Sequence, residues 1–162
     1  MKKFISLLLC LVCMFSLTGC FSDLLSLFET GDMEPEDVVA KMQVHLDDTN
    51  TMKDQISIKI EYDEEFYNYV VTFWSKDMGD ISVAAVRLAY KNRNIEGAST
   101  VINTWETLTE STKEMSKNIE AGIRKLDKDG IVVVNLVNAD NHEDILISAS
   151  GGVILENIMD LY

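Results

Sequence analysis

Apolar residues recur at every second position in two neighbouring segments, which predicts a pair of half-buried strands. In residues 56–62, isoleucines and a tyrosine alternate with polar residues. Residues 66–74 follow with aromatic and β-branched side chains, which favour extended structure. The acidic residues 63–65 between these segments predict a tight turn. We therefore expect a β-hairpin in this part of the chain.

Three further apolar segments predict strands near the C-terminal end. Residues 131–137 are almost continuously apolar, which is typical of a central strand. Residues 145–150 and 153–158 flank Gly151 and Gly152, and glycine readily adopts the positive φ values that a tight hairpin turn needs. These two segments should form a second hairpin.

Three segments with apolar residues at intervals of three and four predict helices. The first begins at Pro35, which suits the first turn of a helix, and ends before Asn50. The second covers residues 81–90, although its valines also suit a strand. The third covers residues 101–126 and is about 39 Å long if it is continuous, with a weak patch at residues 107–112. The expected core-facing residues of the second helix are Ile81, Ala84, Ala85 and Leu88.

The expected order of elements is α-β-β-α-α-β-β-β. Hairpins separated by helices are typical of an α+β domain with two layers. We predict an antiparallel sheet of about five strands with the helices on one face. This single domain should span residues 35–162, after a break that contains Gly31.

The first 20 residues have the composition of a signal peptide. Two lysines precede an apolar run over residues 4–17. A helix of that length reaches about 21 Å, which is less than the roughly 30 Å of a bilayer's hydrocarbon core. We therefore assign residues 1–19 to a signal peptide rather than to a membrane-spanning helix.

The end of this segment, Leu17-Thr18-Gly19-Cys20, resembles the lipobox of bacterial lipoproteins, and all four positions match its consensus. The resemblance implies that the Cys20 thiol receives a diacylglyceryl group and that a peptidase cleaves after Gly19. Cys20 then becomes the N-terminal residue, and its amine is a second position for acylation. No other cofactor is expected. The alternative is an ordinary secretory signal that contains cysteines.

The lipobox resemblance places the protein on the extracytoplasmic face of the cell membrane, held by the lipid on Cys20. Residues 20–34 are then the lipid anchor and a juxtamembrane tether. Apolar residues in the tether predict a short helix among the lipid headgroups, with packing on the domain as the alternative. These residues are Phe21, Leu24, Leu25 and Phe28.

The C-terminal part of the chain carries a second, looser resemblance. From Asp127 through an acidic, Asn-containing loop to Gly151 and Gly152, its pattern is similar to that of small uncharacterised lipoproteins of Gram-positive gut bacteria. Those chains also combine a lipobox with a late helix, strand, loop, strand, glycine turn and strand. The resemblance supports the localisation and implies no activity, because that group has none assigned.

Acidic residues outnumber basic ones in the mature chain. Lys2 and Lys3 are the charged residues of the first 20, so residues 21–162 carry the other 12 basic residues against all 27 acidic ones, a net charge of −15. This charge argues against nucleic acid as a partner, because a phosphate backbone needs basic contacts. It favours a cationic or neutral partner. No cysteine follows Cys20, so the domain has no internal disulfide.

Few residues suit catalysis or metal binding. The two histidines are His45 and His142, and no serine lies in the Gly-x-Ser-x-Gly motif of serine hydrolases. We therefore predict no catalytic residue. Asp140, His142 and Asp144 lie in one polar loop and are weak candidates for a metal site. The same residue types also make turns, so a solvated loop without a metal is the favoured interpretation.

The aromatic hairpin contains the best candidate for a binding surface. Alternation along its second strand places Tyr67, Tyr69 and Phe73 on one face, and Phe66 and Trp74 on the other. One face must be core, and exposed aromatic residues on the other are typical contacts for sugars, peptides or proteins. The simpler interpretation, which we favour, is that helices cover this second face as well.

These observations predict a non-catalytic module, tethered to the membrane, that binds a protein, a peptide or another component of the cell envelope. The alternative is a membrane-anchored hydrolase that acts on envelope material with paired carboxylates, such as Asp140 and Asp144, as acid and base. A small-solute receptor for a transporter is a third interpretation, but such receptors usually need two lobes around a cleft, for which the chain is short.

Overall fold

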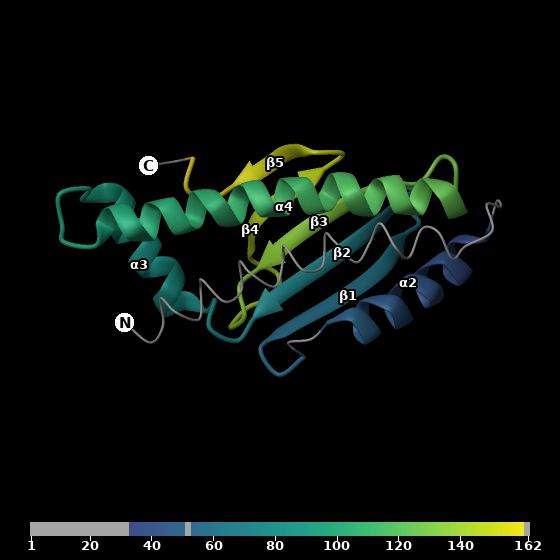
Figure 1. The fold of residues 1–162 in the computed structure, drawn as a ribbon, viewed down its shortest axis with the longest axis horizontal. Coiled ribbons are helices and arrows are strands. Elements are labelled where there is room, and N and C mark those ends of the chain that lie inside the picture. Colours follow the sequence, from purple (N-terminus) through teal and green to yellow (C-terminus); the bar gives the residue numbers. More distant parts are fainter. Residues whose placement is uncertain (1–32, 51–52, 161–162) are drawn as a thin grey trace.

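A computed structural model describes residues 33–50 and 53–160 of the chain (Figure 1). The predictions for cleavage after Gly19, the lipid on Cys20 and the short helix at residues 21–28 lie outside the described residues. The order of helices and strands confirms the predicted α+β arrangement. The elements are α2 (Pro35–Thr49), β1 (Ile56–Asp63), β2 (Asn68–Ser75), α3 (Asp80–Lys91), α4 (Ala98–Leu126), β3 (Ile131–Val137), β4 (Ile145–Ser150) and β5 (Val153–Asn157).

The strands form one sheet in the order β1-β2-β3-β4-β5. Most neighbouring pairs are antiparallel, but β2 and β3 are parallel, with Asn68 opposite Ile131. The prediction of a wholly antiparallel sheet is therefore wrong at this pair. α3 and α4 connect β2 to β3. This long crossover returns the chain to the end of the sheet at which β2 begins. For this reason β3 runs in the same direction as β2.

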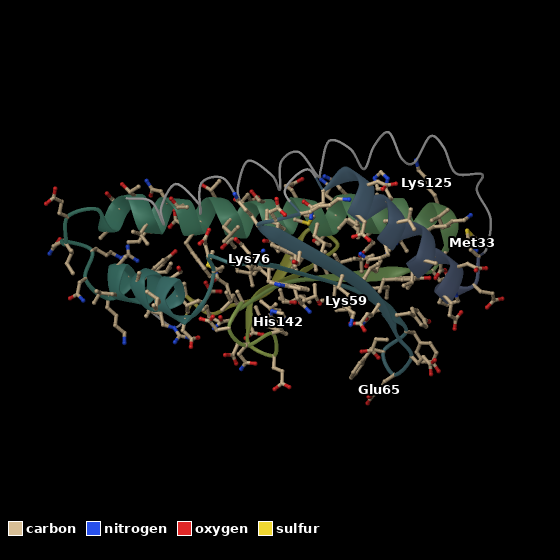
Figure 2. The ribbon with its side chains drawn as sticks, turned by 90° about the horizontal axis from the view of Figure 1, so that it is seen from below. Met33, Lys59, Glu65, Lys76, Lys125 and His142 are labelled. Carbon is tan, nitrogen blue, oxygen red and sulfur yellow. The ribbon has the colours of Figure 1, made fainter. Side chains whose placement is uncertain are left out.

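α2 and α4 lie on one face of the sheet, as expected, whereas α3 packs on α4 rather than on the sheet. α2 packs on β1, and α4 packs across β3, β4 and β5. Figure 1 shows α4 along the long axis of the molecule. In Figure 2, α2 and α4 lie along the upper side of the sheet and α3 lies below α4, whereas His142 and the turn around Glu65 lie below the sheet. Within the described ranges, the lower face of the sheet carries no helix.

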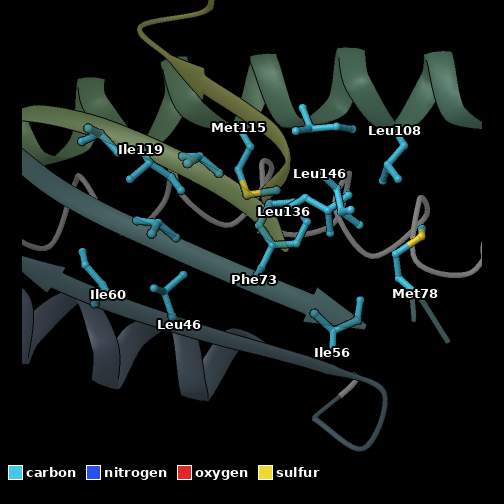
Figure 3. Packing of buried hydrophobic residues seen from close by; sticks show 14 of the residues in the cluster. Leu46, Ile56, Ile60, Phe73, Met78, Leu108, Met115, Ile119, Leu136 and Leu146 are labelled. Atoms are coloured by element: carbon cyan, nitrogen blue, oxygen red, sulfur yellow. The ribbon is translucent and has the colours of Figure 1, made fainter. Parts of the chain in front are cut away.

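The core lies between the sheet and the helices. Alternate strand residues point into it, among them Tyr69, Val71 and Phe73 of β2, which are almost fully buried. Figure 3 shows side chains from the strands, from α2 and from α4 meeting in one layer. Burial of apolar area stabilises a fold by about 25 cal/mol per Å², so this layer is the main source of the domain's stability.

The longest helix, α4, is continuous. Its 29 residues span about 43 Å at the usual rise of 1.5 Å per residue. The weak patch at residues 107–112 does not break it. Hydroxyl groups in this patch donate hydrogen bonds to carbonyl oxygens one turn earlier, at 2.8 Å from Thr107 to Asn103 and at 2.9 Å from Thr112 to Leu108. These polar side chains are thereby satisfied within the helix.

The buried face of α3 is not the predicted one. Val83, Val86 and Ala89 are buried, on the side that packs on α4. Ile81 and Leu88, which were expected to face the core, are 71% and 54% exposed. The helix is apolar on two opposite faces, and only one of them can pack on α4. Periodicity alone therefore could not select the buried face.

The first hairpin is confirmed, with β1 and β2 paired along their whole length. β2 starts at Asn68, so Phe66 and Tyr67 belong to the turn. Tyr67 has a φ of 53°, a left-handed conformation, and its side chain is exposed instead of lying in the predicted core face. Oδ1 of Asp63 accepts hydrogen bonds from the N–H groups of Glu65 and Phe66, which close the turn.

Candidate functional site

A cavity of about 500 Å³ lies between α3, the loop after β3 and the ends of β4 and β5. α3 contributes Asp80, Val83 and Arg87 to its lining. The other lining residues are Asn138, Glu143, Asp144, Ile145, Leu146, Glu156 and Ile158. The cavity therefore brings together segments that are far apart in the sequence.

Hydrogen bonds fix the cavity wall where α3 begins. Asn138 donates from Nδ2 to Oδ1 of Asp80 at 2.6 Å, and the N–H of Asp80 donates to Oδ2 of Asp140 at 2.8 Å. The Asp140 carboxylate thus lies at the N-terminal end of α3, where the helix dipole favours negative charge. The N–H of Asn138 donates to the carbonyl oxygen of Asp144 at 3.0 Å and closes the loop. The loop and the helix are thereby joined into one wall.

The lining combines negative charge with apolar surface. Four carboxylates, one guanidinium and four aliphatic side chains surround the cavity. Two of the aliphatic residues, Val83 and Leu146, are themselves buried and belong to the core. Carboxylates accept hydrogen bonds from an ammonium group, and aliphatic residues pack against the methylene groups that carry it. The cavity therefore complements an amine on an aliphatic stem.

The weak metal candidates do not converge on one point. Asp140 is bonded to the start of α3, and Asp144 lines the cavity. The ring of His142 stacks on Trp74, with 4.4 Å between the ring centroids and 40° between the planes. In the part of the chain that the structure describes, no group of three or more His, Cys, Asp or Glu side chains is arranged to hold a metal ion.

Turn formation accounts for the asparagines of this loop. Oδ1 of Asn138 accepts a hydrogen bond from the N–H of Asp140 at 3.0 Å, and Oδ1 of Asn141 accepts one from the N–H of Glu143 at 3.2 Å. Such contacts replace the backbone hydrogen bond of a turn. They support the interpretation of residues 138–144 as a solvated connection.

The carboxylate pair of the hydrolase interpretation is not formed. Asp144 lines the large cavity, whereas Asp140 lines a separate hollow of about 180 Å³ beside Gly79 and Ser82. General acid–base catalysis needs both groups within reach of the same substrate. The two carboxylates face different hollows, so they do not meet this requirement.

Phe66 and Trp74 do not form one binding surface. Phe66 is 66% exposed in the turn before β2, and Trp74 is half-buried at the other end of that strand. Extended chain between these positions spans about 26 Å. Trp74 contacts His142 on the sheet face that carries no helix among residues 33–50 and 53–160, so within these residues the expectation that helices cover this face is wrong. The reason is that α2 and α4 both pack on the opposite face.

Sequence reasoning missed several cavity residues. Arg87 lies in the middle of a helix and Glu156 in an edge strand, where a charged side chain is an ordinary surface feature. Asn138 and Asp144 are the lining residues at the two ends of the loop that the sequence had singled out. Glu143 belongs to the same loop, and no local pattern marks the remaining residues, because the cavity arises from the packing of α3 beside the ends of β4 and β5.

No protein-family model, curated protein or solved structure matches the chain. Among the helices of residues 33–50 and 53–160, none is both long and apolar enough to cross a bilayer. The function is therefore argued from the sequence and from the geometry of the cavity.

Proposed function

We propose that the protein is a lipoprotein held on the extracytoplasmic face of the cell membrane through Cys20, and that its domain is a non-catalytic binding module. The cavity beside α3 is the observation on which the binding role rests. Its carboxylates outnumber its single guanidinium by four to one. The partner group is a primary amine on an aliphatic chain, such as a lysine side chain of a peptide or a polyamine.

The charge of the whole chain supports a cationic partner. Residues 21–162 carry a net charge of −15, and a potential of this sign attracts cations and raises their local concentration. The methylene groups that carry the amine then pack against the aliphatic residues of the cavity. Binding of this kind depends on ionic strength, because salt screens the attraction beyond about 8 Å at physiological concentration.

A binding role does not need the pair of Asp140 and Asp144 that was expected to act in hydrolysis. The Asp140 carboxylate accepts a hydrogen bond from the N–H of Asp80 at the start of α3. Asp144 lines the cavity, and Asp140 does not. Binding requires only that the cavity carboxylates accept hydrogen bonds, and it needs no proton transfer between two groups. The partner can be a protein, a peptide or another envelope component that carries the amine.

Titration calorimetry with spermidine and with a lysine-rich peptide tests the binding role. Replacement of cavity carboxylates, by Asp144→Asn and Glu156→Gln, should weaken binding, and raised salt should weaken it further. Glu114→Gln, at an exposed position of α4, is the matched control and should bind as the wild type does. Equal affinity in all four proteins, or no binding of either cation, would contradict the proposal.

The anchor is tested on the protein from its native membranes. Mass spectrometry of the N-terminal peptide should find Cys20 as the first residue, with a diacylglyceryl group on its thiol. Cys20→Ser removes the acceptor thiol, so this variant should carry no diacylglyceryl group and should keep its signal peptide. An unmodified Cys20 in the membrane-bound protein would contradict the anchoring.

A further inference from the structure

α3 presents an apolar face to solvent. Ile81 and Leu88 are more than half exposed, and Ala84 and Ala85 between them are exposed as well. Ile95, in the connection to α4, is 50% exposed. We call these five residues the α3 patch. Beside it, an apolar groove of about 170 Å³ runs between α3 and the first turn of α4, and Glu96 is the one charged residue in its lining.

Basic residues accompany the α3 patch in an otherwise acidic domain. Residues 81–95 contain Arg87, Lys91 and Arg93 and no acidic residue. No other stretch of this length after residue 32 lacks an acidic residue. On the helix, Arg87 and Lys91 are four residues apart and therefore share one flank of the exposed apolar face. Arg87 also lines the cavity, and the guanidinium of Arg93 lies 5.9 Å from the centre of the ring of Tyr90, which packs against the core.

We propose that the α3 patch docks on an anionic lipid surface. Apolar side chains bordered by Lys and Arg on an exposed helix face are the combination that binds in the headgroup region of such membranes. Ile81, Leu88 and Ile95 enter the boundary between headgroups and acyl chains, and the basic residues contact lipid phosphates. The inference rests on the proposed anchoring at Cys20, which holds the domain at such a surface.

Phe28, the apolar tether residue nearest to the domain, cannot reach the patch. The N–H of Met33 donates to the carbonyl oxygen of Leu126, at the C-terminal end of α4. The patch lies at the opposite end, beside Ala98 and Val101 in the first turn of α4. The length of α4, about 43 Å, separates the two. Phe28 is five residues before Met33, and that much chain reaches at most about 18 Å.

A second copy of the chain complements the patch poorly. Paired copies most often share a two-fold axis, so each patch would face an identical one. If that axis crosses the helices, so that they pack antiparallel, Arg87 and Lys91 of both copies come together at the rim of the contact. Like charges opposed in this way disfavour association, whereas anionic lipid neutralises them.

The net negative charge of the domain does not prevent the contact. Its repulsion from an anionic surface is screened beyond about 8 Å at physiological salt, so the local charge of the approaching face decides the interaction. Asp77 and Asp140 line one hollow with Ile81 and oppose the contact there. Arg87 and Lys91 favour it along the flank of α3.

The chain from Cys20 to Met33 can span up to about 45 Å, which allows the anchor and the patch to meet one surface at opposite ends of α4. α4 would then lie along the membrane, with the cavity beside the lipid because Asp80, Val83 and Arg87 belong to the same helix.

Hydroxyl-radical footprinting of the full chain on vesicles tests the docking. The chain is reconstituted on vesicles of phosphatidylglycerol and, for comparison, of phosphatidylcholine. Oxidation of Ile81, Leu88 and Ile95 should fall several-fold on the anionic vesicles only. Val44 and Leu155 are equally exposed in the domain, at 62% and 59%, and should be oxidised at the same rate on both. Leu88→Asp should abolish the protection of Ile81, and Leu155→Asp should leave it unchanged.

The docking of the patch and the anchoring at Cys20 are measured separately in this experiment. The N-terminal peptide in the same digest reports whether Cys20 is modified, and an uncleaved leader keeps an unmodified chain on the vesicle through its apolar run. Equal oxidation of the patch on both vesicle types would overturn the docking, whatever the state of Cys20. Protection that grows with the ratio of protein to lipid on both vesicle types would assign the patch to a second copy and overturn it as well.

Discussion

Asn138 and Asp80 are joined by a hydrogen bond of 2.6 Å from Nδ2 to Oδ1, which connects the loop after β3 to the first turn of α3. Asn138 is only 3% exposed, so its amide is satisfied inside the protein and not by bulk water. Asn138→Ala removes this bond and also the one that the Asn138 side chain accepts from the N–H of Asp140. We expect a loss of about 1–3 kcal/mol in the free energy of unfolding.

Urea denaturation measures this loss, and the affinity for spermidine should fall with it because the same bond positions the cavity wall. Asn103→Ala, at an exposed position of α4, is the control and should be neutral or slightly stabilising. Unchanged stability of the Asn138 variant would show that the contact does not hold the wall.

Gly79 leaves the space that the Asp140 carboxylate occupies at the start of α3. A Cβ at this position would lie 2.7 Å from Cγ of Asp140 and closer still to Oδ2. In Gly79→Ala the Asp140 side chain must turn away and lose its bond to the N–H of Asp80. Loss of a helix-capping contact typically costs about 1 kcal/mol, which a denaturation curve resolves.

A double variant checks the cause of that effect. In Asp140→Ala the clash partner is absent, so adding Gly79→Ala should cost less than it does in the wild type. Independent costs that simply add would mean that the two residues do not interfere with each other.

The sequence pattern was sufficient to predict β3 and the last hairpin. β3 is apolar except for Asn135 because it lies in the middle of the sheet, and its predicted bounds agree with the structure. The glycines of the last hairpin have φ values of 54° and 81°, the conformation for which their sequence was singled out. In both cases the residues of the segment itself carry the signal, so no knowledge of the surrounding fold was needed.

Tertiary packing decided the features that the sequence could not reveal. The parallel pairing of β2 and β3 depends on where the two-helix crossover returns the chain. The exposure of Ile81 and Leu88 depends on which apolar face of α3 meets α4. The cavity likewise unites Arg87 and Glu156 from elements that no local pattern connects. Each feature rests on contacts between residues that are distant in the sequence.

His45 in α2 makes the stability depend on pH. Burial lowers the pKa of its imidazole below the ordinary value of 6.5, and the charge of Asp48 opposes this shift. The unfolded chain therefore binds the proton more readily than the folded one. The stabilisation is complete above the unfolded pKa and is lost as the pH falls from 6.5 through the folded pKa.

Urea midpoints between about pH 7.5 and about pH 5.5 measure this dependence. The midpoint should fall over this window in the wild type and fall less in His45→Gln, which has no titrating group at this position. The same slope in both proteins would assign the pH dependence to other residues.

Trp105 in α4 and Asn157 at the end of β5 form the polar contact between the long helix and the edge strand. The indole Nε1 donates to Oδ1 of Asn157 at 3.0 Å, and Trp105 is fully buried. The same oxygen accepts a hydrogen bond from the N–H of Met159, also at 3.0 Å. Asn157→Ala leaves the buried indole without its acceptor, which typically costs about 1–3 kcal/mol.

The conservative variant Asn157→Asp identifies the cause of this loss. A carboxylate keeps an acceptor oxygen at the same position, and it gives up only the long contact of 3.5 Å from Nδ2 to Thr109. Its urea midpoint should therefore lie much closer to that of the wild type than the midpoint of Asn157→Ala does. The fluorescence of Trp105 should shift in the alanine variant alone, because only there does the indole lose its partner. Equal destabilisation by both substitutions would mean that the side-chain amide, and not the acceptor oxygen, holds β5 against α4.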